Sequence, residues 1–266
     1  MPWLALTVEL EGSAAEPFSD ALLEAGAHSV WIEAAGLCAL IDGDAEPALI
    51  VAAAAGALGI AAPAFSTARV ADEDWVRTSQ AHFAPLAVGQ RLWVGASWHR
   101  PEPGRVAVCI DPGLAFGTGS HPSTRLVLRF LEREMSGGER VLDYGCGSGI
   151  LAIAAAKLGA MHVDAVDVDP EAVATTRRNA HLNGVRLHIA PADALAAAHY
   201  DIVVANILAQ PLIVLAPLLA PRAAQLALCG ILETQAEEVM QAYAPWLPMR
   251  VAAREEGWAL LTGRRT

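Results

Sequence analysis

The stretch Val141-Leu-Asp-Tyr-Gly-Cys-Gly-Ser-Gly149 decides the fold, because it leads from an apolar strand through a glycine-rich turn into a helix. Gly145, Gly147 and Gly149 let the backbone turn tightly and approach a ligand without side chains in the way. A dinucleotide-binding turn reads G-x-G-x-x-G, and its third glycine would fall at position 150, where this chain has Ile. The spacing therefore argues against a dinucleotide. It leaves another cofactor, or a turn that merely needs glycine, as the alternatives.

The sequence around and after this turn alternates between strand and helix patterns, which predicts an α/β, doubly wound, mostly parallel sheet. The helix directly after the turn is expected at 150–158. The last pair of strands is expected to be antiparallel, with Trp258-Ala-Leu-Leu-Thr262 closing the sheet. The parallel strands are predicted at 140–144, 162–168, 185–190, 201–205 and 224–230.

The first 70 residues predict a small α+β unit of ferredoxin-like type, because they read strand, helix, strand, strand, helix, strand. A connector with a strand-like run at 91–95 follows, and a further strand is expected at 105–110. The predicted division is a first domain at 1–70, a connector at 71–104 and a second domain at 105–266. Within the first domain, strands are expected at 3–10, 28–41 (one or two short ones) and 65–70, and helices at 16–25 and 47–59.

Composition excludes several classes of protein. With 54% hydrophobic and 18% charged residues, the 266-residue chain can bury a core and is not expected to be disordered. A net charge of −11 argues against nucleic-acid binding and permits a basic protein partner. The four cysteines show no paired metal spacing, so no metal is expected, and the N-terminus lacks a signal-peptide pattern. The longest apolar run, 48–65, favours a buried helix over a membrane span, so we expect a soluble, cytoplasmic protein.

The glycine turn with Asp143 two residues ahead of it resembles the first motif of class I S-adenosylmethionine-dependent methyltransferases. Asp167 ends the next strand and lies 22 residues after Gly145, close to the interval of about 20 at which an acid meets a ribose. We therefore expect Asp167 to accept hydrogen bonds from the ribose hydroxyls. Asp169, followed by Pro170, is instead predicted to cap the next helix.

Asn206 follows the fourth strand, where amino-methylating enzymes of this fold often have Asn-Pro-Pro and an aromatic residue. There the amide and a backbone carbonyl accept hydrogen bonds from the target nitrogen, while the aromatic residue stacks on a planar base or amide. This chain keeps the Asn and lacks both the prolines and the aromatic residue, which favours an aliphatic amine as the methyl acceptor. A helix-capping Asn is the structural alternative. Asp193, after the third strand, is either a partner of the adenine amino group or a turn residue.

The loop Asp111-Pro-Gly-Leu-Ala-Phe-Gly-Thr-Gly-Ser-His-Pro-Ser-Thr124 places one aromatic residue, Phe116, between glycine hinges, as a lid over a ligand does. Thr124 is expected to begin the helix beneath the loop, and its hydroxyl is a candidate partner for the carboxylate of the cofactor. His121 is interpreted as a residue that orders the loop, with general base as the alternative role.

Together these blocks resemble the bacterial methyltransferases that modify the eleventh protein of the large ribosomal subunit, L11. The resemblance covers residues 70–266 well, and Leu114-Ala-Phe-Gly-Thr-Gly119 is its most specific part. It implies a seven-stranded Rossmann-like sheet, S-adenosylmethionine as cofactor, and trimethylation of lysine side chains and the N-terminal amine of L11, free or before ribosome assembly. It also implies a substrate-recruiting N-terminal domain. Carried over by motif, the expected cofactor-binding residues are Thr124, Gly145, Asp167 and Asn206, the last also orienting the amine, with Phe116 as the lid.

Two alternatives stay open at this point. The first is a class I methyltransferase that acts on another protein or on a small-molecule amine. The second is a binding module that keeps the fold but catalyses no reaction. Removal of residues 1–70 distinguishes a ribosomal-protein enzyme from a small-amine enzyme, and methyl turnover excludes the binding module.

Overall fold

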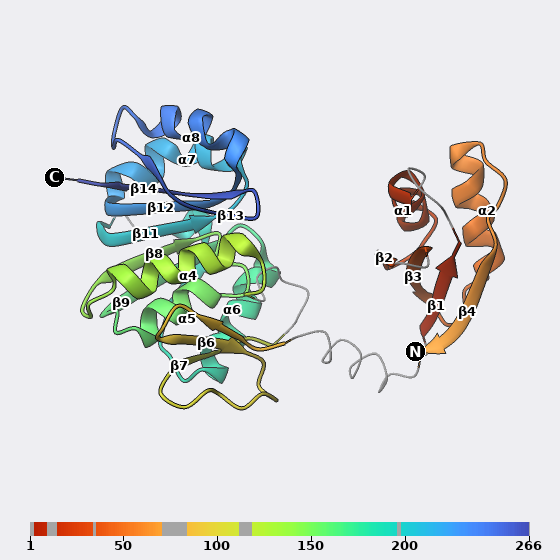
Figure 1. The fold of residues 1–266 in the computed structure, drawn as a ribbon, viewed down its shortest axis with the longest axis horizontal. Helices are drawn as coiled ribbons and strands as arrows, with labels where there is room; N and C mark the ends of the chain where they lie inside the picture. Colours follow the sequence, from red (N-terminus) through yellow and green to blue (C-terminus); the bar gives the residue numbers. More distant parts are fainter. Residues whose placement is uncertain are drawn as a thin grey trace. The chain divides into compact units, whose positions relative to one another are not determined.

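A computed structural model describes residues 3–9, 15–33, 36–70, 84–111, 119–195 and 198–265 (Figure 1). The chain divides into two compact units, Met1–His82 and Phe83–Thr266, which are described separately. The predicted connector, 71–104, consists of residues 71–83, which lie outside the described residues, and of a segment that belongs to the second unit. In the described part of the chain, no helix is both long and apolar enough to cross a membrane.

The first unit has the ferredoxin-like order of elements that the sequence predicts. Its four strands form an antiparallel sheet in the order β2-β3-β1-β4, and the two helices connect β1 to β2 and β3 to β4. Leu6 and Val8 alternate toward the helices and pack with Phe18 and Leu22, so one face of the sheet is buried. The elements are β1 (Trp3–Val8), α1 (Ala15–Glu24), β2 (Ser29–Glu33), β3 (Gly36–Asp42), α2 (Pro47–Leu58) and β4 (Phe65–Val70).

The second unit is built on a seven-stranded sheet in the order β10-β9-β8-β11-β12-β14-β13, which confirms the predicted doubly wound fold. β14 pairs antiparallel with both neighbours, whereas β8 to β12 run parallel. The strand order reverses between β8 and β11, and ligands bind at this point of such sheets. The strands are β8 (Arg140–Tyr144), β9 (His162–Asp167), β10 (His188–Pro191), β11 (Tyr200–Asn206), β12 (Ala223–Leu232), β13 (Arg250–Glu255) and β14 (Trp258–Arg264).

Helices cover both faces of this sheet. The first face packs on α4 and α5 and the second on α7 and α8; Val141 and Leu142 illustrate the alternation, because each joins the core on a different face. Each fully buried Leu, Ile or Val side chain contributes about 1.5–3 kcal/mol, so these two layers dominate the stability of the unit. The helices are α4 (Pro122–Glu134), α5 (Ile150–Lys157), α6 (Pro170–Leu182), α7 (Ala209–Leu219) and α8 (Ala236–Tyr243), with 3₁₀ turns η2 (Ala192–Ala194), η3 (Ala220–Arg222) and η4 (Glu233–Gln235).

A small three-stranded sheet precedes the large one in sequence and packs beside α4 and α5. Its strands are β5 (Leu86–Val88), β6 (Leu92–Gly95) and β7 (Val106–Cys109). The sequence predicted β6 and β7 but not β5, because three residues are too few to show an alternating pattern.

Candidate active site

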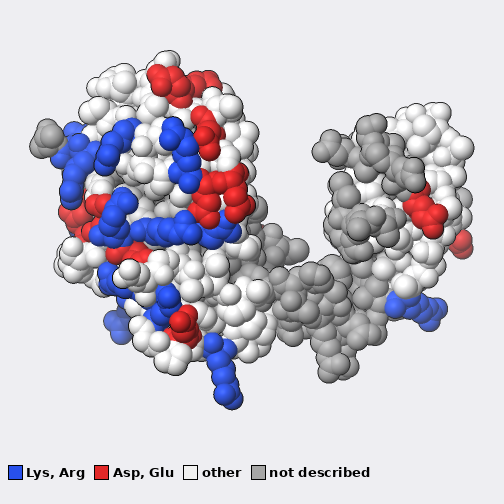
Figure 2. All heavy atoms as spheres, in the orientation of Figure 1, with Lys and Arg blue, Asp and Glu red and all other residues white. Residues whose placement is uncertain are grey.

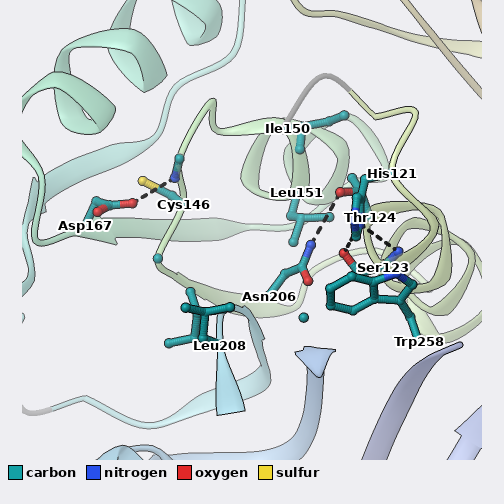
Figure 3. A pocket seen from close by; sticks show the side chains of 14 residues that line it. His121, Ser123, Thr124, Cys146, Ile150, Leu151, Asp167, Asn206, Leu208 and Trp258 are labelled. Carbon is teal, nitrogen blue, oxygen red and sulfur yellow. Dashed lines mark hydrogen bonds between the residues drawn. The ribbon is translucent and has the colours of Figure 1, made fainter. Parts of the chain in front are cut away.

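A cavity of about 360 Å³ opens at the carboxyl ends of β8, β9, β11 and β12 (Figure 3). Four of its lining residues are those that the sequence predicts to bind a cofactor: Thr124, Gly145, Asp167 and Asn206. The fold therefore brings together residues that are far apart in the sequence. The other lining residues are His121, Ser123, Cys146, Gly147, Ile150, Leu151, Ile207, Leu208, Gly230 and Trp258.

The glycine turn forms one wall of this cavity, and its backbone requires glycine. Gly145, Gly147 and Gly149 have φ angles of 77°, 53° and 81°, in the left-handed region that side chains disfavour. A Cβ atom on Gly145 would also lie 2.4 Å from Cγ2 of Ile207. The turn is tied to the next strand because the Gly145 and Cys146 amides donate to the Val166 carbonyl at 2.8 and 3.0 Å.

Two ionisable side chains, Asp143 and Cys146, lie in or beneath this turn. Asp143 is fully buried and its Oδ2 accepts from the Ala152 amide at 3.0 Å. Burial raises the pKa of Asp143 to about 7. Burial also raises the pKa of Cys146 to about 12, so its thiol stays protonated and is no nucleophile at neutral pH.

Asp167 ends β9 and borders the cavity on a different side from Asn206 (Figure 3). Its Oδ2 accepts from the Gly147 amide at 2.9 Å and its Oδ1 from the Asp169 amide at 3.0 Å. Each carboxylate oxygen has a second lone pair, so Asp167 keeps acceptor capacity for a ligand. Asp169 caps α6, accepting from the Glu171 amide at 2.9 Å ahead of Pro170, as the sequence predicts.

Thr124 is buried in the first turn of α4 rather than at its start. The prediction that Thr124 begins the helix was wrong, because His121 is the N-cap and Pro122 is the first helical residue. Nδ1 of His121 lies 2.7 Å from Oγ of Ser123 and accepts from the Ser123 amide at 3.3 Å. Burial and the neighbouring Arg125 lower the pKa of His121. These contacts make His121 the N-terminal cap of α4, and its expected role in ordering the loop stays a prediction.

Asn206 lies at the end of β11 with its amide in the cavity (Figure 3). Its Nδ2 donates to Oγ1 of Thr124 at 3.4 Å, while its Oδ1 is buried and accepts no hydrogen bond from the described residues. The helix-capping alternative is wrong, because the N-cap of α7 is Leu208 and no side chain caps that helix. A buried acceptor without a partner is costly, so a ligand donor is expected there.

The hairpin formed by β13 and β14 provides one wall of the cavity, which the sequence did not predict. Trp258 lines the cavity and meets the His121 ring edge-on, with centroids 4.6 Å apart. Arg125 Nε donates to Glu255 at 2.7 Å and its Nη2 to Glu256 at 2.6 Å, which ties the hairpin to α4. These partners lie about 130 residues apart in sequence, and no local pattern connects them.

Two further predictions concern Phe116 and Asp193. Phe116, the expected lid, falls within 112–118, outside the described residues. Asp193 lies in η2 and is not among the residues that line the cavity, in agreement with the turn interpretation.

The seven-stranded sheet with its antiparallel β14, the glycine turn and the acid at the end of β9 together match a class I, Rossmann-like methyltransferase. A crystal structure of a methyltransferase from Pyrococcus furiosus shares the fold, with a TM-score of 0.50, 17% identity, and coverage of 59% of this chain and 88% of that chain.

The family model of ribosomal protein L11 methyltransferase (PrmA) matches residues 2–266. The chain therefore belongs to the ribosomal protein L11 methyltransferase family, and the resemblance drawn from its motifs is confirmed.

Relatives match along the whole chain. An enzyme of this name from Thiobacillus denitrificans is 46% identical over 293 residues, covering 99% of both chains, and one from Cupriavidus necator is 46% identical, covering 100% of this chain and 99% of its own. A crystal structure of a ribosomal protein L11 methylase from Lactobacillus delbrueckii subsp. bulgaricus is 34% identical, with a TM-score of 0.62 and coverage of 69% of this chain and 100% of that chain.

Proposed function

We propose that the protein transfers methyl groups from S-adenosylmethionine to lysine side chains and the N-terminal amine of ribosomal protein L11. The observation that carries this proposal is the Oδ1 atom of Asn206, a buried acceptor with no partner among the described residues, inside a cavity beside the glycine turn. Membership of the family supports L11 as the substrate.

The residues around the cavity fit this cofactor. The glycine turn leaves space where a Cβ would otherwise protrude, and Asp167 retains lone pairs for the two ribose hydroxyls. Thr124, in the N-terminal turn of α4, suits a carboxylate, because its hydroxyl can donate a hydrogen bond and the N-terminal end of a helix attracts negative charge. S-adenosylmethionine, when bound, supplies a methyl group on a positively charged sulfur that leaves as a neutral thioether.

The acceptor nitrogen must arrive neutral, because only its lone pair can form the new bond to carbon. A lysine amine has a pKa of about 10.4 in water, and an apolar environment lowers that pKa by disfavouring the charged form. Ile150, Leu151, Ile207, Leu208 and Trp258 supply such an environment. Asn206 Oδ1 would accept one N–H of the amine and hold its lone pair toward the methyl group, so positioning and desolvation replace a strong base.

The first unit has its own core, and the described residues that line this cavity belong to the second unit. We assign it, from residue 1 to about 70, the recruitment of L11, and residues 71–104 the role of connector, with the transferase domain at 105–266. The enzyme would act in the cytoplasm on L11 that is free or not yet assembled into the ribosome. Phe116 would close over the bound cofactor.

The proposal is tested by incubating the protein with labelled S-adenosylmethionine and unmodified large-subunit proteins, then locating the label by mass spectrometry. We expect label on lysines and the N-terminus of L11. If only another protein or only a small amine were labelled, the substrate would not be L11, and the alternative methyltransferase function would hold. If no acceptor were methylated, the protein would be a binding module that keeps the fold but catalyses no reaction.

A further inference from the structure

Helix α7, Ala209–Leu219, has an unusual composition for a helix at the surface. Its sequence, Ala-Gln-Pro-Leu-Ile-Val-Leu-Ala-Pro-Leu-Leu, contains no charged residue. The inner side packs against the sheet through Ala209, Leu212, Ala216 and Leu219, all of which are buried. A helix that covers one face of a sheet normally has polar residues on its outer side.

The outer side of α7 is mostly apolar instead, with Gln210 as the exposed polar residue of the helix. Leu208, the N-cap, is 70% exposed and Val214 is 75% exposed. Pro211 and Pro217 are also exposed, so an apolar residue is exposed at every third position from Leu208 to Pro217. Because three residues fall short of a full turn of 3.6, these positions wind around the outer surface of the helix, next to the exposed Gln210. We call Leu208, Pro211, Val214 and Pro217 the α7 stripe. Contiguous apolar surface of this kind marks interaction sites more often than isolated exposed residues do.

The stripe begins at the mouth of the active-site cavity. Leu208 lines that cavity together with Asn206 (Figure 3) and is the first residue of the stripe. A protein that brings an amine to Asn206 must lay its surrounding surface over the mouth, and it therefore contacts Leu208. The remaining residues of the stripe continue this contact along the helix.

Carboxylates border the stripe. α8 packs against α7, and its first turn contains the exposed Glu237 and Glu238. Nε2 of Gln210 donates to Oε1 of Glu238 at 3.4 Å, so this acid lies next to the first turn of α7. Figure 2 shows acidic side chains at the edge of the second unit where Figure 1 draws α8. An apolar strip with an acidic border complements an apolar patch surrounded by lysines or arginines.

We propose that the α7 stripe is a docking surface for the protein substrate, and that it holds the substrate surface around the amine that enters the cavity. The inference rests on the proposed function, because the occupant is the methyl acceptor. It adds a second contact region, on the catalytic unit itself, to the recruitment assigned to the first unit. The substrate chemistry that fits is an apolar patch next to the target lysine with basic residues at its edge.

The first test uses the full-length protein with Val214→Cys, labelled by a maleimide and quantified per peptide by mass spectrometry. We expect rapid labelling of the free enzyme and labelling slowed at least about fivefold by saturating unmodified L11 with S-adenosylhomocysteine, as expected for a contact covered in the complex. Met161→Cys is the matched control, because Met161 is 71% exposed and begins the chain segment into β9. Its labelling should not change with substrate.

Two outcomes overturn the proposal. Equal labelling of Val214→Cys with and without L11 would show that the substrate does not cover the stripe. Slow labelling in the enzyme alone would show that the first unit or a second copy of the chain covers it instead. Methylation of L11 by the unmodified enzyme is measured first, so an inactive wild type refutes the proposed function and not the docking surface.

The second test is kinetic and uses Val214→Lys, which places a positive charge where a basic partner should dock. We expect KM for L11 to rise by about tenfold with kcat unchanged, as expected for a contact made equally in the ground and transition states. A short lysine peptide that reaches the cavity without covering α7 should be methylated at the wild-type rate. Unchanged KM for L11, or an equal loss with the peptide, would contradict the docking role.

Discussion

Asn206 differs from the other polar side chains of the cavity in having an unused atom. Asp167 receives two backbone hydrogen bonds, and Thr124 and Ser123 each have a partner, whereas Oδ1 of Asn206 is buried without a partner among the described residues. A protein retains such an atom where a ligand completes its hydrogen bonding. The sequence points to this residue because it follows an apolar strand directly, at the edge where ligands bind, and its role in the reaction stays a prediction.

Replacing Asn206 by Ala should lower kcat for L11 by about a hundredfold, because a lost positioning contact in the transition state has that effect. The dissociation constant of S-adenosylmethionine, measured by calorimetry, separates the two expected roles: it should rise if Asn206 also binds the cofactor and stay unchanged if Asn206 orients the amine alone. Asn183→Ala is a matched control, since Asn183 binds the backbone of Cys109 and not the cavity. An unchanged kcat in Asn206→Ala would remove the residue from the reaction.

Asp143 should make the stability of the protein depend on pH. Its pKa is about 7 in the folded protein and 3.8 in the reference state, because burial favours the neutral acid. Because the pKa of Asp143 is higher in the folded than in the unfolded protein, its contribution to the free energy of unfolding is fully present below pH 3.8. That contribution is lost as the pH rises to about 7, where the buried carboxyl must ionise. The loss is about 4 kcal/mol at most, from about 1.4 kcal/mol per pKa unit.

Asp143→Asn removes this titration while keeping an acceptor for the Ala152 amide. Urea unfolding of both proteins from pH 4 to pH 7.5 should therefore show a wild type that loses stability relative to the variant as the pH increases. The comparison cancels the contributions of Glu134 and Glu255, which both proteins share. A difference in the free energy of unfolding that is constant across this range would contradict the assignment.

At the scale of elements, the sequence predicted the architecture better than the walls of the site. Strand and helix periodicity, the glycine turn and Asp169 with Pro170 located β8, β9, α5 and α6, because each signal is local. The sequence did not predict that the hairpin with Trp258 forms part of the site. Its contacts with α4 join residues about 130 positions apart, and only tertiary packing brings them together.

Glu255 connects this hairpin to α4 through two arginines, Arg125 at 2.7 Å and Arg129 at 2.5 Å. Burial alone would raise the pKa of Glu255, but the hydrogen bonds from both arginines hold that pKa below its ordinary value. Glu255→Gln should lower the melting temperature by about 2–4 °C, from a loss of about 1 kcal/mol. It should also weaken cofactor binding, because Trp258 is then held less firmly.

The control for this variant is Glu256→Gln in the same turn. Glu256 is 67% exposed at its side chain and, among the described residues, pairs with Arg125, so its pair contributes about 0–1 kcal/mol. Thermal unfolding with and without S-adenosylmethionine measures both effects. Equal, small changes in the two variants would show that the hairpin is positioned by packing and not by its ion pairs.

At the scale of the whole molecule, we propose that the two units divide the work between them. The first unit has a ferredoxin-like fold with its own core, and every described residue that lines the cavity belongs to the second. We therefore expect cofactor binding and methyl transfer to a small acceptor from the second unit alone. Efficient binding of a folded protein substrate requires additional contact surface. A second binding region on the first unit provides it, because once one region has bound the substrate, the effective concentration of the substrate at the other region is raised.

A chain restricted to residues 84–266 should bind S-adenosylmethionine with the affinity of the full protein and methylate a short lysine peptide at the same rate. Its KM for L11 should rise by at least about tenfold, because the linked contact of the first unit is lost. Calorimetry and steady-state kinetics on both chains make the comparison, and circular dichroism confirms that the shorter chain is folded. If KM for L11 stayed the same in a folded, active 84–266 chain, recruitment would belong to the second unit alone, with the α7 stripe as its principal docking surface.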